Sequence, residues 1–416
     1  MSLLESPKAQ ALLAEAVVEP EAVRSCVRSL SSFLARYLPL FYRKEQAANA
    51  TITIKGMLSD LQRKTCEPIA RRAGVTRKPI QFFVGSGLWN DEAVMAELRQ
   101  HVVEERGNAE GILVFDPTSF VKKGKASCGV KRQWCGRLGK VENCQVGLFL
   151  IYATPEGYAP LDRRLFLPED WAKDRKRCKK THVPREIVFR RKHEMALDML
   201  ERDRAKVPHR WIAGDDEFGR SAEFRAQLRA KGEGYVLDVP RDTLVRDLGR
   251  KPPRGRRAGT FERAEEWLKR QPPCRWEEFA VADGWKGRVH VQGMRVAVRA
   301  MLGKRIGPPE TLVVMRTLED EPQIRFGMSN AGPEVPLLEE IRVMVQRHKI
   351  EELFEAAKGE VGLAQYEVRS WVGWHHHMTL ALLALWFVIG ERQRLGKKNP
   401  SADSPGNSQH FLPHSA

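Results

Sequence analysis

The sequence predicts an α/β protein whose core is built around a mixed sheet. Three short apolar runs, typical of neighbouring strands, come first: residues 112–115, 145–153 and 160–168. Two helical stretches, 193–204 and 221–231, then alternate with two further strands, 210–214 and 235–239. At 416 residues the chain is too long for one compact core of usual size, so we expect further structural units around this one.

The first 105 residues are expected to form a separate helical domain. Apolar residues recur at helical spacing in 11–18, 23–37 and 92–103. The segment 61–75 carries four basic residues on or near an expected helix followed by Gly74, which would suit a helix lying on DNA phosphates. A solvated basic face explains the same pattern equally well. We predict an N-terminal DNA-binding domain over residues 1–105 and the first part of the core over residues 106–240.

The composition changes again after residue 240. A Pro/Gly/Arg-rich run at 249–257 is followed by two expected strands at 288–300 and 311–316. Because helix-forming sequence resumes only at Leu337, we predict a β-rich insertion over 241–336 and C-terminal core helices over 337–396. The tail, 397–416, is rich in Ser, Pro and Asn and is expected to be disordered.

The charge balance favours a polyanionic partner. The chain has 70 Lys and Arg against 53 Asp and Glu, a formal charge of +17, and nucleic acid is the leading candidate. The longest apolar run, 378–390, is shorter than the roughly 20 residues that span a bilayer, so we expect a buried core helix and no membrane. The N-terminal residues lack the pattern of an export signal, which favours a cytoplasmic, nucleoid-associated protein.

The cysteines and histidines give no sign of a zinc site. The seven cysteines show no CxxC pair and no ordered Cys/His spacing, so we expect core thiols and neither a zinc knuckle nor a disulfide framework. Three consecutive histidines, His375, His376 and His377, point in different directions on a helix. We therefore interpret them as a polar helix start and leave them out of any metal site.

Three acidic residues far apart in the chain suggest a divalent metal site. Asp116 and Asp215 each follow an apolar strand, and ligands gather beyond the carboxyl ends of strands in open α/β sheets. Glu351, on a later helix, can join them, and carboxylate oxygens are the ligands that Mg²⁺ prefers. For either aspartate alone, capping of a turn or of the next helix is the better interpretation.

Helical periodicity selects Glu351 among the neighbouring acids. Three candidates lie close together: Glu351, Glu352 and Glu355. The expected buried face consists of Ile350, Leu353, Phe354 and Ala357. Glu351 borders this face, about 100° from Ile350, whereas Glu352 points to solvent. Lys358 lies nearly over Glu351, where its ammonium could hold a DNA phosphate; a surface pair with Glu355 is the alternative.

A basic, glycine-punctuated segment follows Asp116. Its basic residues are Lys122, Lys123, Lys125, Lys131, Arg132, Arg137 and Lys140. Beside a carboxylate pocket, such a loop can bring backbone and cations close to phosphate oxygens. A solvated surface loop is the alternative, although so much positive charge is less usual there.

At these residues the chain resembles bacterial insertion-sequence transposases of the DDE class, in particular the IS-seven-oh-one group, which is related to the IS-four superfamily. The resemblance spans most of residues 60–395. Its matching stretches begin FDPTSFVKKGK at Phe115, PLDRRLFLPEDW at Pro160, WIAGDDEFG at Trp211 and KIEELFEAAKG at Lys349. It implies a ribonuclease H-like fold in which Asp116, Asp215 and Glu351 form the catalytic triad and Arg347 and Lys358 bind phosphate.

The resemblance also implies the reaction and its partners. Two Mg²⁺ ions per active site, for which Mn²⁺ can substitute, would support cleavage at the ends of the element and strand transfer into target DNA. The expected partner is double-stranded DNA, held by a homodimer that pairs two element ends. Pro117, Met344 and His376 depart from the family pattern. A nuclease that joins nothing, or a degenerate DNA-binding copy, remain the alternatives.

Overall fold

The computed structural model describes residues 20–251, 259–284 and 287–396. They form one twelve-stranded sheet in the order β2-β3-β1-β5-β6-β12-β11-β10-β7-β8, with β4 beside β3 and β9 beside β10. The strands of the first half are β1 (Ile112–Val121), β2 (Lys131–Cys135), β3 (Lys140–Thr154), β4 (Gly157–Leu165), β5 (Trp211–Gly214) and β6 (Gly234–Val239). Those of the second half are β7 (Leu244–Asp247), β8 (Glu262–Arg263), β9 (Glu277–Gly284), β10 (Gly287–Leu302), β11 (Arg305–Thr317) and β12 (Ile324–Ser329).

Strands β4-β3-β1-β5-β6 form a ribonuclease H-like core, as predicted. The first three are joined by antiparallel pairing, and β1, β5 and β6 run parallel to one another. Parallel neighbours require crossover connections, which here contain helices. These are α7 (Glu169–Lys173), α8 (Arg175–Lys180) and α9 (Lys192–Asp203) before β5, and α10 (Asp216–Gly219) and α11 (Ala222–Ala230) before β6.

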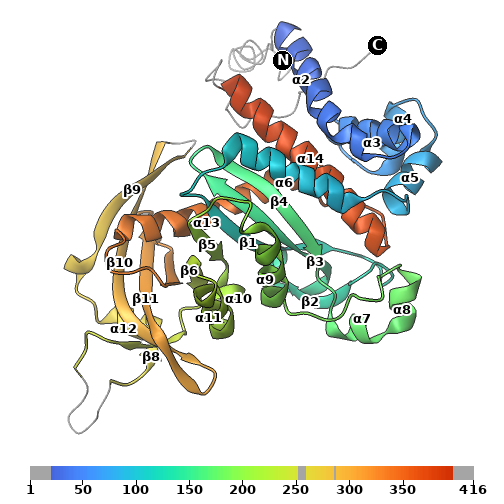
Figure 1. Cartoon of the computed structure of the whole chain (residues 1–416). Helices are drawn as coiled ribbons and strands as arrows, with labels where there is room; N and C mark the ends of the chain where they lie inside the picture. The colour runs from blue at the N-terminus through green and yellow to red at the C-terminus, as the bar shows by residue number, and fades with distance from the viewer. Residues whose placement is uncertain (1–19, 252–258, 285–286, 397–416) are drawn as a thin grey trace, which may run out of the picture.

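The segment expected as an insertion continues the same sheet. Strand β12 pairs antiparallel with β6, so β7 to β12 extend the core sheet, and α12 (Ala264–Lys269) packs on them (Figure 1). A buried ion pair joins this half to the core. Arg225 on α11 donates to Glu310 on β11 at 2.8 Å, and Glu310 also accepts from the Tyr235 hydroxyl on β6 at 2.6 Å.

Helices from both ends of the chain cover the other side of the core (Figure 1). The N-terminal helices are α2 (Pro20–Tyr37), α3 (Lys44–Met57), α4 (Cys66–Arg72), α5 (Arg77–Gly85) and α6 (Asp91–Arg106), and the C-terminal ones are α13 (Leu337–Glu360) and α14 (Trp371–Gly396). Arg163 of β4, fully buried, pairs with Asp91 and Glu92 at the start of α6. This contact anchors the N-terminal helices to the sheet.

Helix α14 is the buried core helix that the apolar run 378–390 predicted. Its window is long and apolar enough to cross a membrane, but 83% of that window is buried inside the fold. The helix therefore packs as a core element on β4, beside α6, and contacts α3 and α5 of the N-terminal helices. Among the described cysteines none is paired, and five of the seven are buried.

The three histidines differ from the expected polar helix start. They lie within α14, and all three are buried against α14's neighbours. His376 stacks on Trp89, with ring centroids 3.8 Å apart, and burial lowers the pKa of His376 to about 4. These side chains are thus neutral packing groups, because their rings fill the space between α14 and the helical domain.

Some expected segments lie outside the described residues. These are the first 19 residues, which include the helical stretch 11–18, the part of the Pro/Gly/Arg-rich run at 252–258, and the tail 397–416. The division of the chain into domains stays a prediction.

Candidate active site

Asp116 and Asp215 lie side by side on adjacent parallel strands. Phe115 of β1 is in register with Gly214 of β5, so the next residue on each strand is an aspartate. Strand β5 ends there, as expected, whereas β1 continues to Val121 beside β3. Asp116 is therefore within its strand, at the point where pairing with β5 stops, and both carboxylates occupy the same edge of the core.

Each aspartate also makes a local hydrogen bond. The Asp215 carboxylate caps α10 by accepting from the Glu217 backbone N–H at 3.1 Å. Asp116 accepts from the Thr118 hydroxyl at 3.2 Å. The capping interpretation therefore holds for Asp215, and it fixes the carboxylate next to Asp116 without consuming both of its oxygens.

The two carboxylates carry negative charge that the protein only partly neutralises. Burial and, to a smaller extent, the neighbouring charge of Asp116 raise the pKa of Asp215 to about 7, although Arg347 opposes that shift. Burial also raises the pKa of Asp116, although Arg347 and the Thr118 hydroxyl oppose that shift. Two adjoining carboxylates with raised pKa values form a site that an added cation would stabilise.

Arg347 on α13 is the cation nearest these acids. Its side chain is 8% exposed, and its guanidinium meets three carboxylates from different elements. The distances are 3.5 Å from Nη2 to Asp116 Oδ1, 3.5 Å from Nε to Asp238 Oδ2 and 3.7 Å from Nη1 to Glu351 Oε1. The family resemblance gave Arg347 a phosphate-binding role, and here it bridges the acids of the site.

Asp238 is a fourth acid that the sequence interpretation missed. It lies on β6, next to β5, and follows the apolar residues 235–237, which is the same signal that marked Asp116 and Asp215. Burial raises the pKa of Asp238 to about 6, and Arg347 and Arg325 oppose that shift. The three aspartates therefore come from β1, β5 and β6, the three parallel strands of the core.

Glu351 approaches the aspartates through Arg347. Its side chain is 70% exposed, one helical turn after Arg347, and its Oε1 also lies 3.7 Å from His348 Nδ1. Glu352 is also exposed to solvent but lies about 100° farther around α13, where its charge raises the pKa of Tyr158. The expected buried face of α13, including Ile350 and Ala357, is buried.

The carboxylate oxygens of Asp116 and Asp215 suit a divalent metal, although, among the described residues, a third acid does not lie close enough to share the ion. Over the described ranges, no group of three His, Cys, Asp or Glu side chains is close enough to hold a metal ion. However, Asp116 and Asp215 present hard oxygen donors in a negatively charged, buried setting, as Mg²⁺ requires. Buried nitrogens around them lack hydrogen-bond partners, namely Arg347 Nε, Arg325 Nε and His348 Nε2.

The basic loop lies farther from the carboxylates than expected. Lys122 is six residues beyond Asp116 along an extended strand, which corresponds to about 20 Å. Lys122 Nζ lies 3.2 Å from the centre of the Tyr366 ring, and burial lowers its pKa to about 8. Lys131 pairs with Asp170 at 2.9 Å. The side chain of Arg137 lies outside the described residues.

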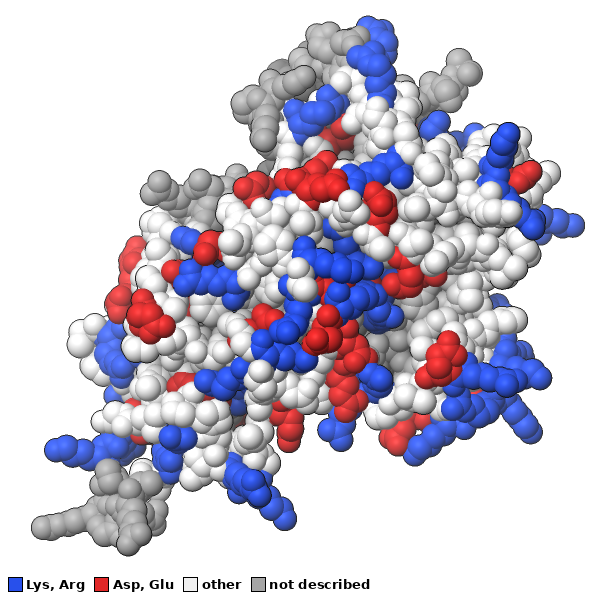
Figure 2. Space-filling view, in the orientation of Figure 1, with Lys and Arg blue, Asp and Glu red and all other residues white. Residues whose placement is uncertain are grey.

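The remaining basic residues of the loop form part of a surface patch with α8. Its exposed members are Lys123, Lys125, Lys131, Arg132, Arg175, Lys176, Lys179 and Lys180. Figure 2 shows this concentration of Lys and Arg at the lower right, where Figure 1 has α7 and α8. Lys358, by contrast, is close enough to the site for its charge to lower the pKa of Asp116.

The chain is similar in sequence to an insertion-sequence transposase over part of its length. A 156-residue stretch is 28% identical to the probable transposase for insertion sequence element IS701 from Microchaete diplosiphon, covering 35% of this chain and 41% of that relative. Among solved structures, the NurA nuclease from Sulfolobus solfataricus aligns with a TM-score of 0.28 and 12% identity, over 64% of this chain and 92% of the nuclease.

The family match covers the two adjoining aspartates. Residues 36–301 match the sequence model of a family described as DDE superfamily endonuclease, a range that contains Asp116, Asp215 and Asp238 and ends before Glu351. Since this match covers more than half of the chain, the protein belongs to the DDE superfamily endonucleases.

Proposed function

We propose that this protein is a DDE transposase that cleaves DNA at the ends of an insertion sequence and joins those ends to target DNA. The observation that carries the proposal is the pair of adjoining aspartates, Asp116 and Asp215, which face Arg347 and Glu351 of α13 in a DDE-family chain. The similarity to an insertion-sequence transposase supports the same role. Its site of action would be nucleoid DNA in the cytoplasm.

Asp116, Asp215 and Glu351 would hold two Mg²⁺ ions, or Mn²⁺ in their place. A metal bound there supplies a more acidic water and stabilises the charge on the leaving oxygen. Asp116 and Asp215 contribute oxygens whose positions are fixed by the sheet and by the α10 cap. Glu351 would be the third ligand. Its side chain is exposed, so a change of rotamer could bring its carboxylate towards the two aspartates.

Basic side chains would position the DNA. The charge of Lys358 lowers the pKa of Asp116, and this ammonium would contact a phosphate next to the cleaved bond. Exposed Lys123, Lys125, Lys131 and Arg132, together with α8, offer a second surface for the phosphate backbone. This surface lies well away from the carboxylates, so it would hold a flanking stretch of duplex. Pairing of two ends would require a homodimer in the DNA complex.

The triad is tested by isosteric substitution in a cleavage assay. Asp116→Asn, Asp215→Asn and Glu351→Gln should each abolish Mg²⁺-dependent cleavage of DNA that borders the gene, while DNA binding measured without metal is unchanged. Glu352→Gln, one residue along α13, is the matched control and should cleave as the wild type does. Substantial cleavage by a triad variant would remove that residue from the site.

Analysis of the products then distinguishes transposition from simple cleavage. A transposase should give DNA in which the cut 3′ end is covalently joined to a target plasmid. Cleavage without any joined product would favour a ribonuclease H-like nuclease, and specific binding without cleavage would favour a degenerate DNA-binding copy.

A further inference from the structure

Helices α4 and α5 have the organisation of a helix-turn-helix. Seven residues of α4 and nine of α5 are joined by a four-residue turn, 73–76, that contains Gly74 with φ of +66°. A left-handed residue in this turn is suited to glycine, because it has no Cβ. Short helices joined by a three- or four-residue turn with glycine are typical of DNA-binding helix pairs.

The packing fixes this pair against α3 as a three-helix unit. The inward side chains Ile69 and Ala70 of α4 and Ile80 and Phe83 of α5 are all buried. Helix α4 comes so close to α3 that a Cβ on Gly56 would lie 2.5 Å from the Ile69 side chain. A basic surface that only faces solvent would not require such close packing between helices. The three helices therefore form a closely packed unit that holds α5 in place.

The opposite side of the unit is exposed and basic. Every residue from Arg71 to Pro79 is exposed, and this stretch carries four basic residues and no acidic one; three of them, Arg71, Arg72 and Arg77, pair with Glu67 or Asp60. Figure 2 shows these blue side chains at the edge of the molecule where Figure 1 has α4 and α5. A polyanion is the partner that this charge favours.

The two helices differ in what their exposed side chains can do. On α4, Arg71 pairs with Glu67 at 3.3 Å and Arg72 pairs with Asp60 at 2.7 Å. On α5, the outward face presents Lys78 and Phe82, the latter 64% exposed, and Gln81 is exposed at the border of this face, where it also lines a cavity against the core. A lysine, an amide and an exposed aromatic ring are groups that contact guanine, adenine and the thymine methyl in the major groove.

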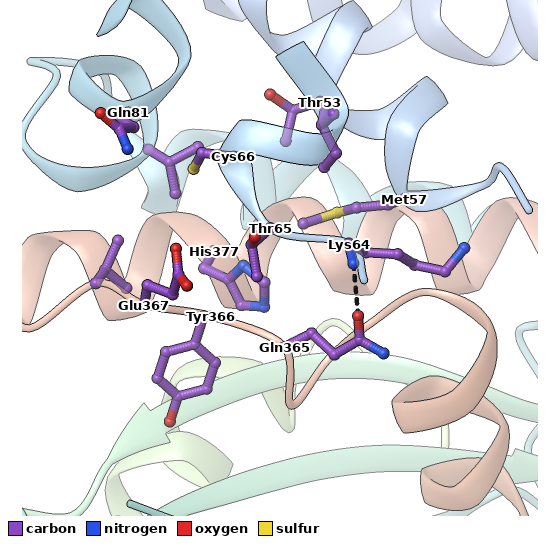
Figure 3. A pocket seen from close by; sticks show the side chains of 13 residues that line it. Thr53, Met57, Lys64, Thr65, Cys66, Gln81, Gln365, Tyr366, Glu367 and His377 are labelled. Atoms are coloured by element: carbon purple, nitrogen blue, oxygen red, sulfur yellow. Dashed lines mark hydrogen bonds between the residues drawn. The ribbon is translucent and has the colours of Figure 1, made fainter. Parts of the chain in front are cut away.

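The unit is seated on the core so that α5 remains accessible. The Lys64 backbone N–H donates to Gln365 Oε1 at 2.6 Å, and Arg63 pairs with Glu367 at 2.6 Å. A cavity of about 210 Å³ lies between the unit and the segment before α14, bordered by Gln81 on the α5 side (Figure 3). Because Ile80 and Phe83 face inward, Lys78 and Phe82 face away from the core.

We propose that α5 is a recognition helix that enters the major groove of the element-end DNA, where Lys78, Gln81 and Phe82 read base edges. The proposal rests on the proposed function for the identity of the DNA. It transfers the DNA-contacting role from the basic segment 61–75, which the sequence favoured, to the following helix. Helix α4 then crosses the backbone, as the first helix of such a pair does.

The test compares specific with non-specific binding in the absence of metal. Fluorescence anisotropy would follow the full-length protein binding to a duplex that borders the gene and to a shuffled duplex of the same composition. Gln81→Ala/Phe82→Ala should lower affinity for the bordering sequence by about tenfold or more and leave the shuffled duplex nearly unchanged. Both side chains are exposed, so circular dichroism and thermal midpoint should match the wild type.

Tyr42→Ala is the matched control, because Tyr42 is a 95% exposed aromatic residue of the same domain outside α5. It should keep the wild-type preference. An unchanged preference in the double variant would overturn the reading role of α5, and so would an equal loss on both duplexes. If the wild type itself showed no preference, both this inference and the proposed function would fail; in the other two cases only the inference does.

Discussion

Binding of Mg²⁺ to the Asp116–Asp215 pair should weaken steeply as the pH falls below about 7. The cause is the raised pKa of Asp215, about 7 against an ordinary 3.8, which burial and the adjoining Asp116 charge produce. In the metal-free folded protein this carboxyl is protonated below about pH 7, whereas an ordinary aspartate is already ionised above about pH 4. Mg²⁺ must displace that proton, because only the ionised carboxylate is a ligand.

The expected size follows from the pKa shift. A difference of about three units corresponds to roughly 4 kcal/mol of disfavour for the charged carboxylate in the metal-free fold. At about pH 5, two units below the folded pKa, the apparent affinity for Mg²⁺ should be about 100-fold weaker than on the plateau above pH 7. The same shift means that the metal-free fold loses stability as pH rises from about 4 to about 7.

Isothermal titration calorimetry measures both the affinity and the released proton. Titrations in buffers of different ionisation enthalpy should report about one proton released per protein at about pH 5 and close to none at about pH 8. Asp215→Asn should abolish the proton release. Asp216→Asn changes the adjacent, exposed aspartate on the same turn, whose charge is only a minor cause of the raised pKa of Asp215, and should keep most of the proton release.

A flat affinity across this range, or binding without proton release, would refute the assignment of Asp215 as a buried metal ligand. Asp116 also has a raised pKa, so the two acids titrate as a coupled pair, and the apparent pKa belongs to the pair. The comparison of Asp215→Asn with Asp216→Asn remains informative, because only the first removes a member of that pair.

Three further predictions concern the surroundings of the site. Asp238→Asn removes the charge opposite Arg347 Nε and should slow cleavage about 10- to 100-fold in a metal-dependent assay without changing the thermal midpoint by much; wild-type cleavage would contradict its positioning role. Glu310→Ala leaves Arg225 buried without its partner and should lower the free energy of unfolding in urea by about 3–5 kcal/mol, whereas a loss below about 1 kcal/mol would show that the pair is not needed. His376→Phe keeps an aromatic ring against Trp89 but cannot be protonated. Since the pKa of His376 is about 4 when folded, the free energy of unfolding of the wild type falls by up to roughly 3 kcal/mol as pH falls from about 6.5 to about 4. The variant should therefore lose less thermal stability in acid than the wild type.

The sequence predicted the core strands because their burial is continuous. Residues 112–115 and 211–214 are apolar and buried on both faces of the sheet, which is the pattern of central parallel strands. The strand was expected to end at residue 115, before Asp116 and Pro117. The strand instead continues, because β5 ends at Gly214 and leaves one side of β1 open, where a proline removes no ladder hydrogen bond.

The candidate site was only partly predictable, because the sequence does not show which acidic side chains lie close together in the folded protein. Asp238 gave the same local signal as Asp215, an aspartate after buried residues, but Val239 extends its strand and hides the resemblance to a strand end. Nothing local revealed that Arg347, more than 100 residues later, would lie 3.5 Å from it. Conversely, the lysines after Asp116 looked adjacent to the site only because their distance along the extended strand was not known.

The extended sheet explains how Glu351 is brought to the aspartates. Helix α13 begins where Arg295 of β10 pairs with Glu340 at 2.9 Å and donates to the Val335 carbonyl at 2.7 Å. The second half of the sheet therefore sets the starting point of the helix that carries Glu351. Because one turn separates Arg347 from Glu351, the guanidinium that meets Asp116 also determines the approach of the third acid. Residues 241–336 thus influence the position of α13 through these contacts, although none of their strands supplies one of the three acids that we propose as the triad.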